Sequence, residues 1–553
     1  MPSAQPDRFV HEHLPPLDQW PEFRYDPPEQ QPPSQLNLVQ ALFDRAEVSG
    51  HAQRPLLRSD ERTLTYAQAR VEVNRLANVL TDELGLVPGN RVLLRGGNTI
   101  GMALAWLAVV QAGLIAVATM PLLRAQELSA IIKKSCPSVA LCDASLQAEL
   151  RVAWVGNASS AASPLILFNA KEVGTETLES LAVRQSEHAE PCPTASSDIA
   201  MLAFTSGTTG NPKAAVHSHG DIWAACATWP EHVLRATEDD IVMGSPPLAF
   251  TFGLGGLLIF PMWAGASVYF PGIPYTPEAM VTLMNRVGAT ICYTAPTFYR
   301  QMAPFAQQHG VGRLRISVSA GEGLPDATRQ LWKFASGLEM LDGIGATEMF
   351  HIFISSPPES VRRGAVGQVV PGYLARVVDE EGHELPVGDV GRLAVKGPTG
   401  CRYLDDSRQS VYVQGGWNLP GDAFRQDAEG YFFYQARTDD MIITAGYNVA
   451  GPEVESALMA HPAVAECGVV GRPDDERGMV IVAYVVLKSG QTGGALQVKA
   501  LQDHVKQSLA PYKYPRDVIF IDKLPRTETG KLQRFALRNL ATQDHTTRQG
   551  PIP

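Results

Sequence analysis

The chain lacks the cysteine spacing of a zinc site or a disulfide framework. Its seven cysteines are scattered, and no two of them form a CxxC pair, the spacing that metal sites and redox motifs commonly use. The first residues are polar and contain no apolar core of a secretory signal. An odd number of cysteines and a polar start together predict a protein of the reducing cytoplasm.

Positive charge is scarce. Lysine and arginine number 46 against 57 aspartates and glutamates, a formal net charge of −11, and the sequence contains no basic run. We therefore expect neither nucleic acid nor an anionic membrane as a partner. Residues 101–120 are apolar enough for a membrane span, but Gly113 interrupts them, and the stretch predicts a buried helix followed by a core strand.

Internal repeats at solenoid periods are also missing. A length of 553 residues is too great for one ordinary core and predicts at least two domains. Helix and strand signals alternate through residue 290, which is typical of α/β layers with mostly parallel sheets. After residue 440, a further set of helix and strand signals predicts a small α+β unit.

No Walker A motif is present, although one stretch carries the groups that a polyphosphate requires. An apolar run at 201–204 predicts a strand, which is followed by a turn rich in glycine, serine and threonine and then by a lysine. Glycines let backbone N–H groups approach phosphate oxygens closely, hydroxyls donate further hydrogen bonds, and lysine adds positive charge. The pattern predicts a phosphate-binding loop, and a polar surface turn is the alternative. The residues of this loop are Thr205, Ser206, Gly207, Thr208, Thr209, Gly210 and Lys213.

The run 205–213, TSGTTGNPK, resembles the phosphate-loop signature of the adenylate-forming superfamily, which contains acyl- and aryl-CoA synthetases, adenylation domains and firefly-type luciferases. Further motifs of that family follow in order along most of the chain. The resemblance implies an α/β fold with a large N-terminal domain, residues 1–438, of layered, mostly parallel sheets with helices, which binds ATP and the acyl group. It also implies a small, mobile α+β C-terminal domain, residues 439–553, which turns about a hinge at Asp439.

Two predicted strands, 314–319 and 338–341, are each followed by a short turn. Ligands gather at the carboxyl ends of strands in parallel α/β sheets, and by resemblance these turns border the nucleotide. The second turn continues into Thr347 and Glu348, which the resemblance makes catalytic. A carboxylate beside bound phosphates must repel them or hold a cation, so Glu348 is the candidate ligand for Mg²⁺. The residues that would border the nucleotide are Gly321, Glu322, Asp342, Gly343 and Ile344.

Two later motifs complete the nucleotide site by resemblance. Asp422 and Arg437 match the family's ribose-binding pair, which suits a vicinal diol because a carboxylate accepts hydrogen bonds and a guanidinium donates them. Lys531 matches the catalytic lysine, which would lie between the substrate carboxylate and the α-phosphate of ATP; a surface lysine is the alternative. The sequence departs from the family at Ile344, where an aromatic residue is frequent, and at Ala436, where glycine is commoner.

A glycine-rich aromatic stretch, 245–266, and an apolar run around a histidine, 349–353, suit the walls of a flat pocket. Core packing is the alternative for both. Many relatives carry a histidine near residue 250, whereas this chain has Phe-Thr-Phe-Gly, in outline as the benzoate-type ligases do. The residues assigned to the acyl pocket are Phe250, Thr251, Phe252, Gly253, Tyr293, Ala295, Gly345, His351 and Ile352.

Coenzyme A is the expected thiol substrate. By resemblance, Gly446 and Tyr447 line the tunnel through which its thiol would enter once the small domain has turned. Tyr512, Tyr514 and Arg516 combine aromatic faces with positive charge and suit the nucleotide end of coenzyme A. A solvated basic turn explains these last three residues equally well.

The whole chain resembles the aryl-CoA branch of the family. An ATP-dependent ligase of this kind forms an aryl-AMP, releases pyrophosphate and passes the aryl group to coenzyme A. The N-terminal segment, residues 13–37, looks most like 2-aminobenzoate-CoA ligases, so 2-aminobenzoate is the expected substrate and benzoate the second choice. Two other classes stay open: an enzyme that loads the aryl group onto a carrier-protein thiol, and an idle relative that only binds nucleotide. The presence of Lys213, Glu348, Asp422 and Lys531 together argues against an idle relative.

Overall fold

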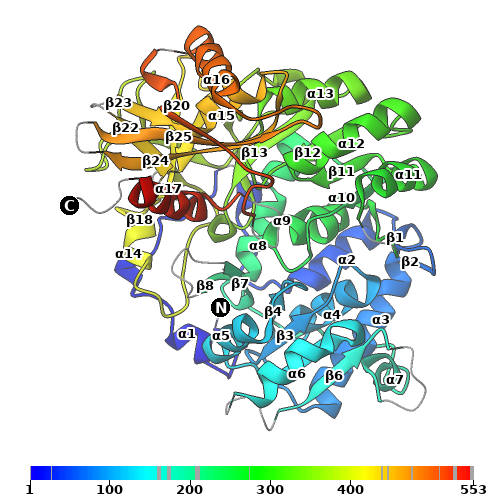
Figure 1. Cartoon of the computed structure of the whole chain (residues 1–553). Coiled ribbons are helices and arrows are strands. Elements are labelled where there is room, and N and C mark those ends of the chain that lie inside the picture. The colour runs from blue at the N-terminus through cyan, green and yellow to red at the C-terminus, as the bar shows by residue number, and fades with distance from the viewer. Residues whose placement is uncertain are drawn as a thin grey trace.

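The computed structural model describes residues 2–26, 28–157, 163–170, 176–205, 212–272, 275–437, 440–444, 447–474, 477–509, 511–526 and 532–548. The loop residues 206–210, the hinge residue Asp439, Gly446 and Lys531 lie outside these ranges. The predicted boundary between residues 438 and 439 therefore stays a prediction. Figure 1 shows a large body and, beside it, a smaller one formed by the C-terminal elements.

The first sheet contains the strand that leads into the predicted phosphate loop. β7 (Ile199–Thr205) lies parallel to β4 and antiparallel to β8. The strands β3, β4 and β5 are buried at every residue, as expected when helices cover both faces of a parallel sheet. In spatial order the other strands are β6 (Leu165–Phe168), β5 (Val139–Asp143), β3 (Arg91–Arg95), β4 (Ile115–Thr119) and, beyond β7, β8 (Lys213–Ser218).

One helix beside this sheet is buried on all sides. In α4 (Ile100–Gln111) every residue except Gly101 is buried, and the chain then enters β4. Gly113, between them, has φ +73°, and a Cβ atom there would lie 2.5 Å from the Cys192 sulfur. The structure thus confirms the predicted buried helix and core strand, and the described part of the chain contains no helix with the length and hydropathy of a membrane span.

The second sheet is the largest and carries the two predicted nucleotide turns. Its central strands run parallel, and strands at both ends are antiparallel. In spatial order its strands are β15 (Gln368–Val369), β14 (Ile352–Ser355), β13 (Met340–Gly345), β12 (Ile316–Ser319), β11 (Ile291–Thr294), β9 (Ile241–Gly244), β10 (Ser267–Tyr269), β1 (Pro55–Arg58) and β2 (Thr63–Thr65).

The predicted turn after residue 341 is wrong in one respect. β13 continues through Asp342, which pairs with β12, to Gly345, because Gly343, Ile344 and Gly345 pair antiparallel with β14. Glycines signal a turn locally, but here they allow close pairing: a Cβ atom at Gly345 would lie 2.4 Å from the His351 carbonyl oxygen.

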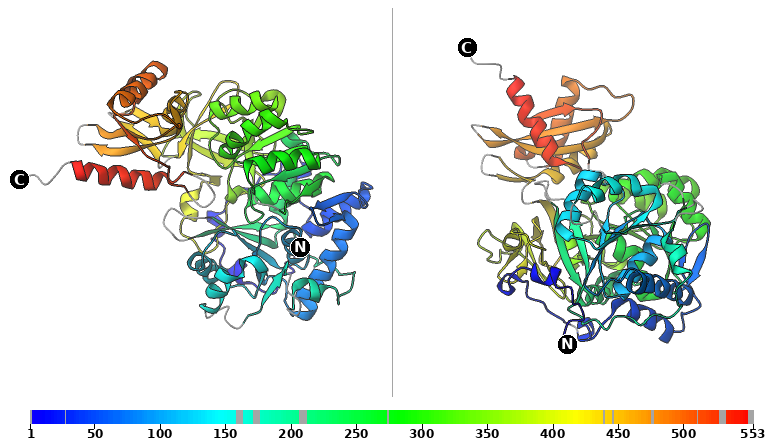
Figure 2. Two further views of the ribbon diagram at one scale, coloured as in Figure 1. Left: turned by 45° about the vertical axis from the view of Figure 1, so that its right-hand side comes forward. Right: turned by 90° about the horizontal axis from the view of Figure 1, so that it is seen from below.

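A third, antiparallel sheet follows, and a fourth lies in the small body. The third contains β16 (Leu374–Val378), β17 (Val390–Lys396), β18 (Val413–Gln414), β19 (Trp417–Asn418), β20 (Asp422–Gln426) and β21 (Phe432–Arg437). The fourth contains β22 (Met441–Thr444), β23 (Tyr447–Ala450), β24 (Val464–Asp474), β25 (Gly478–Leu487) and β26 (Asp517–Phe520). Helices flank the fourth sheet, which makes the small body α+β (Figure 2).

Most helices of the large body flank the first two sheets, and α14 (Gln409–Tyr412) lies beside β18 of the third (Figure 1). The helices of the large body are α1 (Phe9–Glu12), α2 (Leu38–Val48), α3 (Tyr66–Asn78), α5 (Ala125–Ser135), α6 (Gln147–Val155), α7 (Leu178–Ala182), α8 (His219–Cys226), α9 (Thr251–Leu254), α10 (Phe260–Ala264), α11 (Pro277–Val287), α12 (Pro296–His309), α13 (Asp326–Ser336) and α14, together with α4. Those of the small body are α15 (Gly451–Met459), α16 (Ala495–Ser508) and α17 (Arg534–Arg548).

A buried ion pair joins the segment after β17 to the start of α8. The Arg402 guanidinium contacts the Asp221 carboxylate, and both side chains are almost completely buried. Asp221 also accepts from the Ser218 backbone N–H at 2.7 Å and so caps α8. The Arg402 guanidinium also lies over the rings of Trp20 and Phe23, which fixes the N-terminal segment against this pair.

We expect Arg402→Met to destabilise the large body by about 3–5 kcal/mol, because it leaves the Asp221 carboxylate buried without a counter-charge. Urea unfolding followed by tryptophan fluorescence measures this loss. The double variant Arg402→Met/Asp221→Asn removes both charges and should recover part of it. Equal stability of the single and double variants would show that the pair is not what stabilises this junction.

Candidate active site

The two described ends of the predicted phosphate loop lie side by side. Thr205, the last residue of β7, pairs directly with Lys213, the first residue of β8. The hydroxyl oxygen of Thr205 is buried and has no hydrogen-bond partner among the described residues. The loop thus closes a hairpin at the carboxyl end of a strand, the position at which α/β sheets bind ligands.

Lys213 and Glu348, far apart in the sequence, meet at this hairpin. Glu348 lies on the short helix η7 (Thr347–Met349), and its Oε1 atom is 3.7 Å from the Lys213 ammonium. The hydroxyl of Tyr403 accepts from Lys213 at 3.0 Å and donates to Glu348 Oε1 at 2.5 Å. The carbonyl of Thr347, one residue before, contacts the His217 imidazole at 2.7 Å. The predicted pair is therefore joined through a tyrosine that the sequence did not single out.

Glu348 fits a shared magnesium site. Its side chain is 10% exposed, and the described residues form no cluster of three or more acidic, histidine or cysteine side chains that could hold a metal alone. Mg²⁺ is commonly held by one or two carboxylates together with substrate phosphates and water. A carboxylate beside Lys213 matches that donor set, and phosphate oxygens of a bound nucleotide would have to supply further ligands.

The residues predicted to border the adenine also converge. β12 and β13 are parallel neighbours, with Ser319 opposite Asp342, so the turn at Gly321 and Glu322 emerges beside β13. The Glu322 carboxylate accepts from the Thr297 hydroxyl at 2.6 Å. Burial raises the pKa of Asp342 to about 6, against the opposing charge of a neighbouring arginine.

The ribose pair is preformed. Asp422 and Arg437 are opposite each other on β20 and β21, and the Arg437 guanidinium lies 3.2 Å from the Asp422 carboxylate. Gly421 has φ +82°, and a Cβ atom there would lie 2.9 Å from the Arg437 guanidinium. Glycine at this position leaves room for the arginine, whose positive charge lies against a nearly buried carboxylate.

His351 lies inside an aromatic cage. Ring centroids of Phe260, Phe252 and Trp229 are 4.6, 5.5 and 5.2 Å from its imidazole, which is 5% exposed. By geometry neither ring nitrogen has a hydrogen-bond partner among the described residues, although the Phe252 backbone lies near enough to favour the protonated ring. Burial lowers the pKa of His351 to about 3, so the imidazole is neutral at physiological pH.

Two further buried polar atoms without a partner in the described chain belong to this cage. They are the Trp229 indole nitrogen and the Tyr293 hydroxyl, on rings 6.3 Å apart. Glycines make room for the cage: a Cβ atom at Gly255 would lie 2.7 Å from the His351 ring, and one at Gly256 would lie 2.6 Å from the Tyr293 ring. The predicted glycine-rich wall therefore brings aromatic rings against a helix backbone.

The other residues assigned to the acyl pocket are close in sequence to residues of this cage. Thr251 begins α9, after Phe250 at the preceding position, and is 4% exposed. Ala295 precedes α12, and Ile352, directly after His351, begins β14. Gly253 approaches the Pro247 carbonyl so closely that a Cβ atom would lie 2.1 Å from its oxygen.

The residues predicted for coenzyme A lie in the small body. Lys506 and Arg516 flank the ring of Tyr514, at 4.2 and 4.1 Å from its centroid. Lys513 is paired with Glu453 at 2.7 Å. Tyr512 lies beside Lys513 on the turn η10 (Pro511–Lys513), and Tyr447 begins β23. These contacts join residues within the small body, and they agree both with a site for coenzyme A and with a solvated basic turn.

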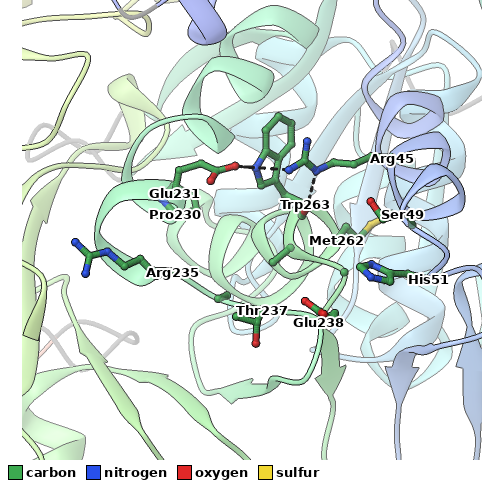
Figure 3. A pocket seen from close by; sticks show the side chains of 14 residues that line it. Arg45, Ser49, His51, Pro230, Glu231, Arg235, Thr237, Glu238, Met262 and Trp263 are labelled. Carbon is green, nitrogen blue, oxygen red and sulfur yellow. Dashed lines mark hydrogen bonds and ion pairs between the residues drawn. The ribbon is translucent and has the colours of Figure 1, made fainter.

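A separate hollow of about 220 Å³ lies away from these residues (Figure 3). Two of its charged groups contact each other: Arg45 lies 3.7 Å from Glu231, whose carboxylate accepts from the Trp263 indole N–H at 2.5 Å. None of the predicted site residues lines this hollow. The volume of this hollow therefore does not indicate where the site lies.

Comparisons with known proteins agree with the motif order. A model of the family described as AMP-binding enzyme matches residues 44–402, and one for the AMP-binding enzyme C-terminal domain matches residues 453–531. The chain is 35% identical over 518 residues to the benzoate–CoA ligase of Thauera aromatica, covering 93% of this chain and 98% of that one.

The chain belongs to the AMP-binding enzyme family.

Solved structures agree with this assignment. The fold superposes on the anthranilate CoA ligase AuaEII in complex with anthranoyl-AMP with a TM-score of 0.86, 33% identity, and coverage of 93% of this chain and 99% of that one. For ATP-bound MatB from Rhodopseudomonas palustris the TM-score is 0.83, the identity 29%, and the coverage 92% and 99%. The expected fold class is confirmed, and the AMP-binding enzyme is an ATP-dependent, AMP-forming ligase of the aryl-CoA branch.

Sequence reasoning missed two residues of this AMP-binding enzyme's site. Tyr403 stands in the run Cys-Arg-Tyr-Leu, which carries no local signal beyond an aromatic residue among core residues. Trp229 lies three residues beyond the end of α8, directly before a proline, and belongs to no motif. Only long-range packing brings Tyr403 to Lys213 and Glu348, and Trp229 to the cage around His351.

The buried histidines make stability depend on pH. Burial lowers the pKa of His351 to about 3 and of His219 to about 4, whereas in the unfolded chain each takes up a proton near its ordinary 6.5. The unfolded state therefore binds more protons below that pH, and the free energy of unfolding falls as pH drops below about 6.5.

We expect His351→Leu to make this pH dependence shallower between pH 6 and 5, by about 1 kcal/mol per pH unit. Urea unfolding at several pH values measures the slope. His188→Leu, which removes an exposed histidine, is the matched control and should leave the slope unchanged. An unaltered slope in His351→Leu would mean that this imidazole is not held neutral.

Proposed function

We propose that this aryl-CoA ligase activates 2-aminobenzoate as its aryl-AMP and transfers the aryl group to coenzyme A. The observation that carries the proposal is the aromatic cage whose interior polar atoms have no partner among the described residues. The similarity to a ligase solved with anthranoyl-AMP supports the same substrate. Benzoate is the second candidate, since the relative from Thauera aromatica is named for it.

The cage suits an aromatic ring that carries a small polar group. Phe252 and Phe260 offer flat apolar faces beside His351. A neutral imidazole has one nitrogen that accepts and one that donates, and burying an amine without an acceptor is costly. An ortho-amino group could donate to His351 or to the Thr251 hydroxyl, whereas benzoate would leave the His351 nitrogens without a partner among the described residues.

The charged end would carry out adenylation. Lys213 and the phosphate loop would bind the phosphates of ATP, and Asp422 with Arg437 would hold the ribose. Bound Mg²⁺, held by Glu348 and phosphate oxygens, would neutralise negative charge on the triphosphate. Lys531 would lie between the substrate carboxylate and the α-phosphate, where the negative charges of the two reactants converge.

The second half-reaction would need a different arrangement. The lysine and the entering thiol of coenzyme A cannot occupy one place at once, so we place a hinge at Asp439, about which residues 439–553 turn. Gly446 and Tyr447 would then line the thiol tunnel, and Tyr512, Tyr514 and Arg516 would meet the nucleotide end of coenzyme A. A carrier-protein thiol remains the alternative acceptor, and turnover with free coenzyme A against turnover with a phosphopantetheinyl carrier separates the two.

Lys531→Ala should block formation of the adenylate and spare its use. Loss of one pre-aimed charge typically costs on the order of 3 kcal/mol in the step it serves. ATP–pyrophosphate exchange reports the first half-reaction, and thioester formation from preformed aryl-adenylate reports the second. Lys523→Ala, an exposed lysine of the same domain, is the control. An equal fall in both half-reactions would contradict the role given to Lys531.

Thr251→Val and His351→Leu should lower kcat/KM for 2-aminobenzoate more than for benzoate. The expected difference is on the order of 1–3 kcal/mol where an acceptor for the amine is lost, because a site that pairs a polar group rejects the analogue without it. AMP release with coenzyme A, measured for both acids on each variant, gives the ratio. If both substrates suffer alike in both variants, recognition of the amine is wrong and the ligase assignment stands.

A further inference from the structure

Lys213 and Glu348 carry opposite charges at the charged end of the site, yet their ion pair is long and contains no direct hydrogen bond. Their closest atoms are 3.7 Å apart, whereas charge-assisted N–H···O contacts in direct pairs are about 2.7–2.9 Å long. The Tyr403 hydroxyl is closer to each of them, at 3.0 Å from the ammonium and 2.5 Å from the carboxylate. The Lys213 ammonium and the Glu348 carboxylate therefore each lie closer to the neutral Tyr403 hydroxyl than to each other.

The position of Tyr403 is fixed by the backbone on both sides. The Val216 N–H donates to the Arg402 carbonyl at 2.8 Å, and the Leu404 N–H donates to the Ala214 carbonyl at 2.9 Å. Residues 402–404 thus extend the sheet along the outer edge of β8, the strand that begins with Lys213.

Side chains fix Tyr403 as well. Its N–H donates to the Gln409 side chain at 2.9 Å, and the Gln409 amide in turn donates to the Gln19 carbonyl at 2.8 Å. The tyrosine ring is 1% exposed and lies edge-on to Tyr412 at 5.8 Å. A hydroxyl on so rigid a support cannot follow either charge if that charge moves.

We propose that Tyr403 is a positioning residue whose hydroxyl keeps Lys213 and Glu348 from closing into a direct ion pair. The ammonium then remains available to a nucleotide phosphate, and the carboxylate remains available to a divalent cation.

Removing the hydroxyl alone creates a distinctive defect. In Tyr403→Phe nothing separates the two charges, and in a nearly buried site they attract each other strongly. Phosphate would then have to break the new pair before it could reach Lys213. The loss should appear for ligands that carry phosphates and not for the nucleoside.

Equilibrium binding without any aryl substrate tests this. We expect Tyr403→Phe to raise the Kd for ATP about tenfold, both with Mg²⁺ and in EDTA, and to leave the Kd for adenosine unchanged. The matched control is Tyr412→Phe, which removes a buried hydroxyl that has no hydrogen-bond partner among the described residues and lies on the neighbouring ring. It should bind ATP as the unmodified protein does.

A double variant identifies the cause. Glu348→Gln removes the charge that would trap Lys213, so in EDTA the variant Tyr403→Phe/Glu348→Gln should bind ATP within about twofold of Glu348→Gln alone, although Tyr403→Phe alone is weak. Recovery of this kind is not expected if the phenyl ring merely disturbs the fold.

Each possible outcome either supports or overturns the proposal. Weak ATP binding, unchanged adenosine binding and recovery in the double variant support the proposal. Unchanged ATP binding in Tyr403→Phe, an equal loss for ATP and adenosine, or no recovery with Glu348→Gln would each overturn it. The inference rests on the roles proposed for Lys213 and Glu348, but its readout contains no aromatic acid, so its failure and the failure of the 2-aminobenzoate proposal are distinguishable.

Discussion

The pairing of residues 402–404 with the outer edge of β8 is the constraint on which the charged end of the site depends. Alternate residues of an extended segment face opposite sides, and here the two sides serve different purposes. Leu404 packs into the core on one face of the first sheet, and Tyr403 belongs to the larger core on the other. Because the segment follows β17, this one edge pairing also joins the third sheet to the first and brings Tyr403 to Lys213 and Glu348.

Features with local causes could be predicted from the sequence. The run through α4 and β4 is apolar because both elements are buried, so composition alone predicts a buried helix and a core strand. The glycines and hydroxyls after β7 predict a phosphate loop by their chemistry, and the order of the later motifs predicts the family. Asp422 and Arg437 could be paired in advance only by resemblance, since they lie on two strands whose register the sequence does not reveal.

Features that arise from long-range packing could not be predicted. Tyr403 and Trp229 reach the site through contacts with segments far away in the chain, and neither belongs to a pattern with a period or a motif. The end of β13 illustrates the same limit. Its glycines favour a turn locally, but antiparallel pairing with β14 satisfies their backbone groups and extends the strand to Gly345, which in turn sets the position of His351.

The site separates its charges from its aromatic cage, and this separation restricts where the chemistry can occur. Lys213, Glu348, Asp422 and Arg437 carry the charges, whereas the unpartnered polar atoms of the cage in the described chain belong to the neutral side chains of His351, Trp229 and Tyr293. A carboxylate moved fully into the cage would lose its hydration without gaining a counter-charge, which is strongly unfavourable. An aryl substrate of the proposed kind would therefore have to keep its carboxylate outside the cage while its ring lies against the aromatic side chains.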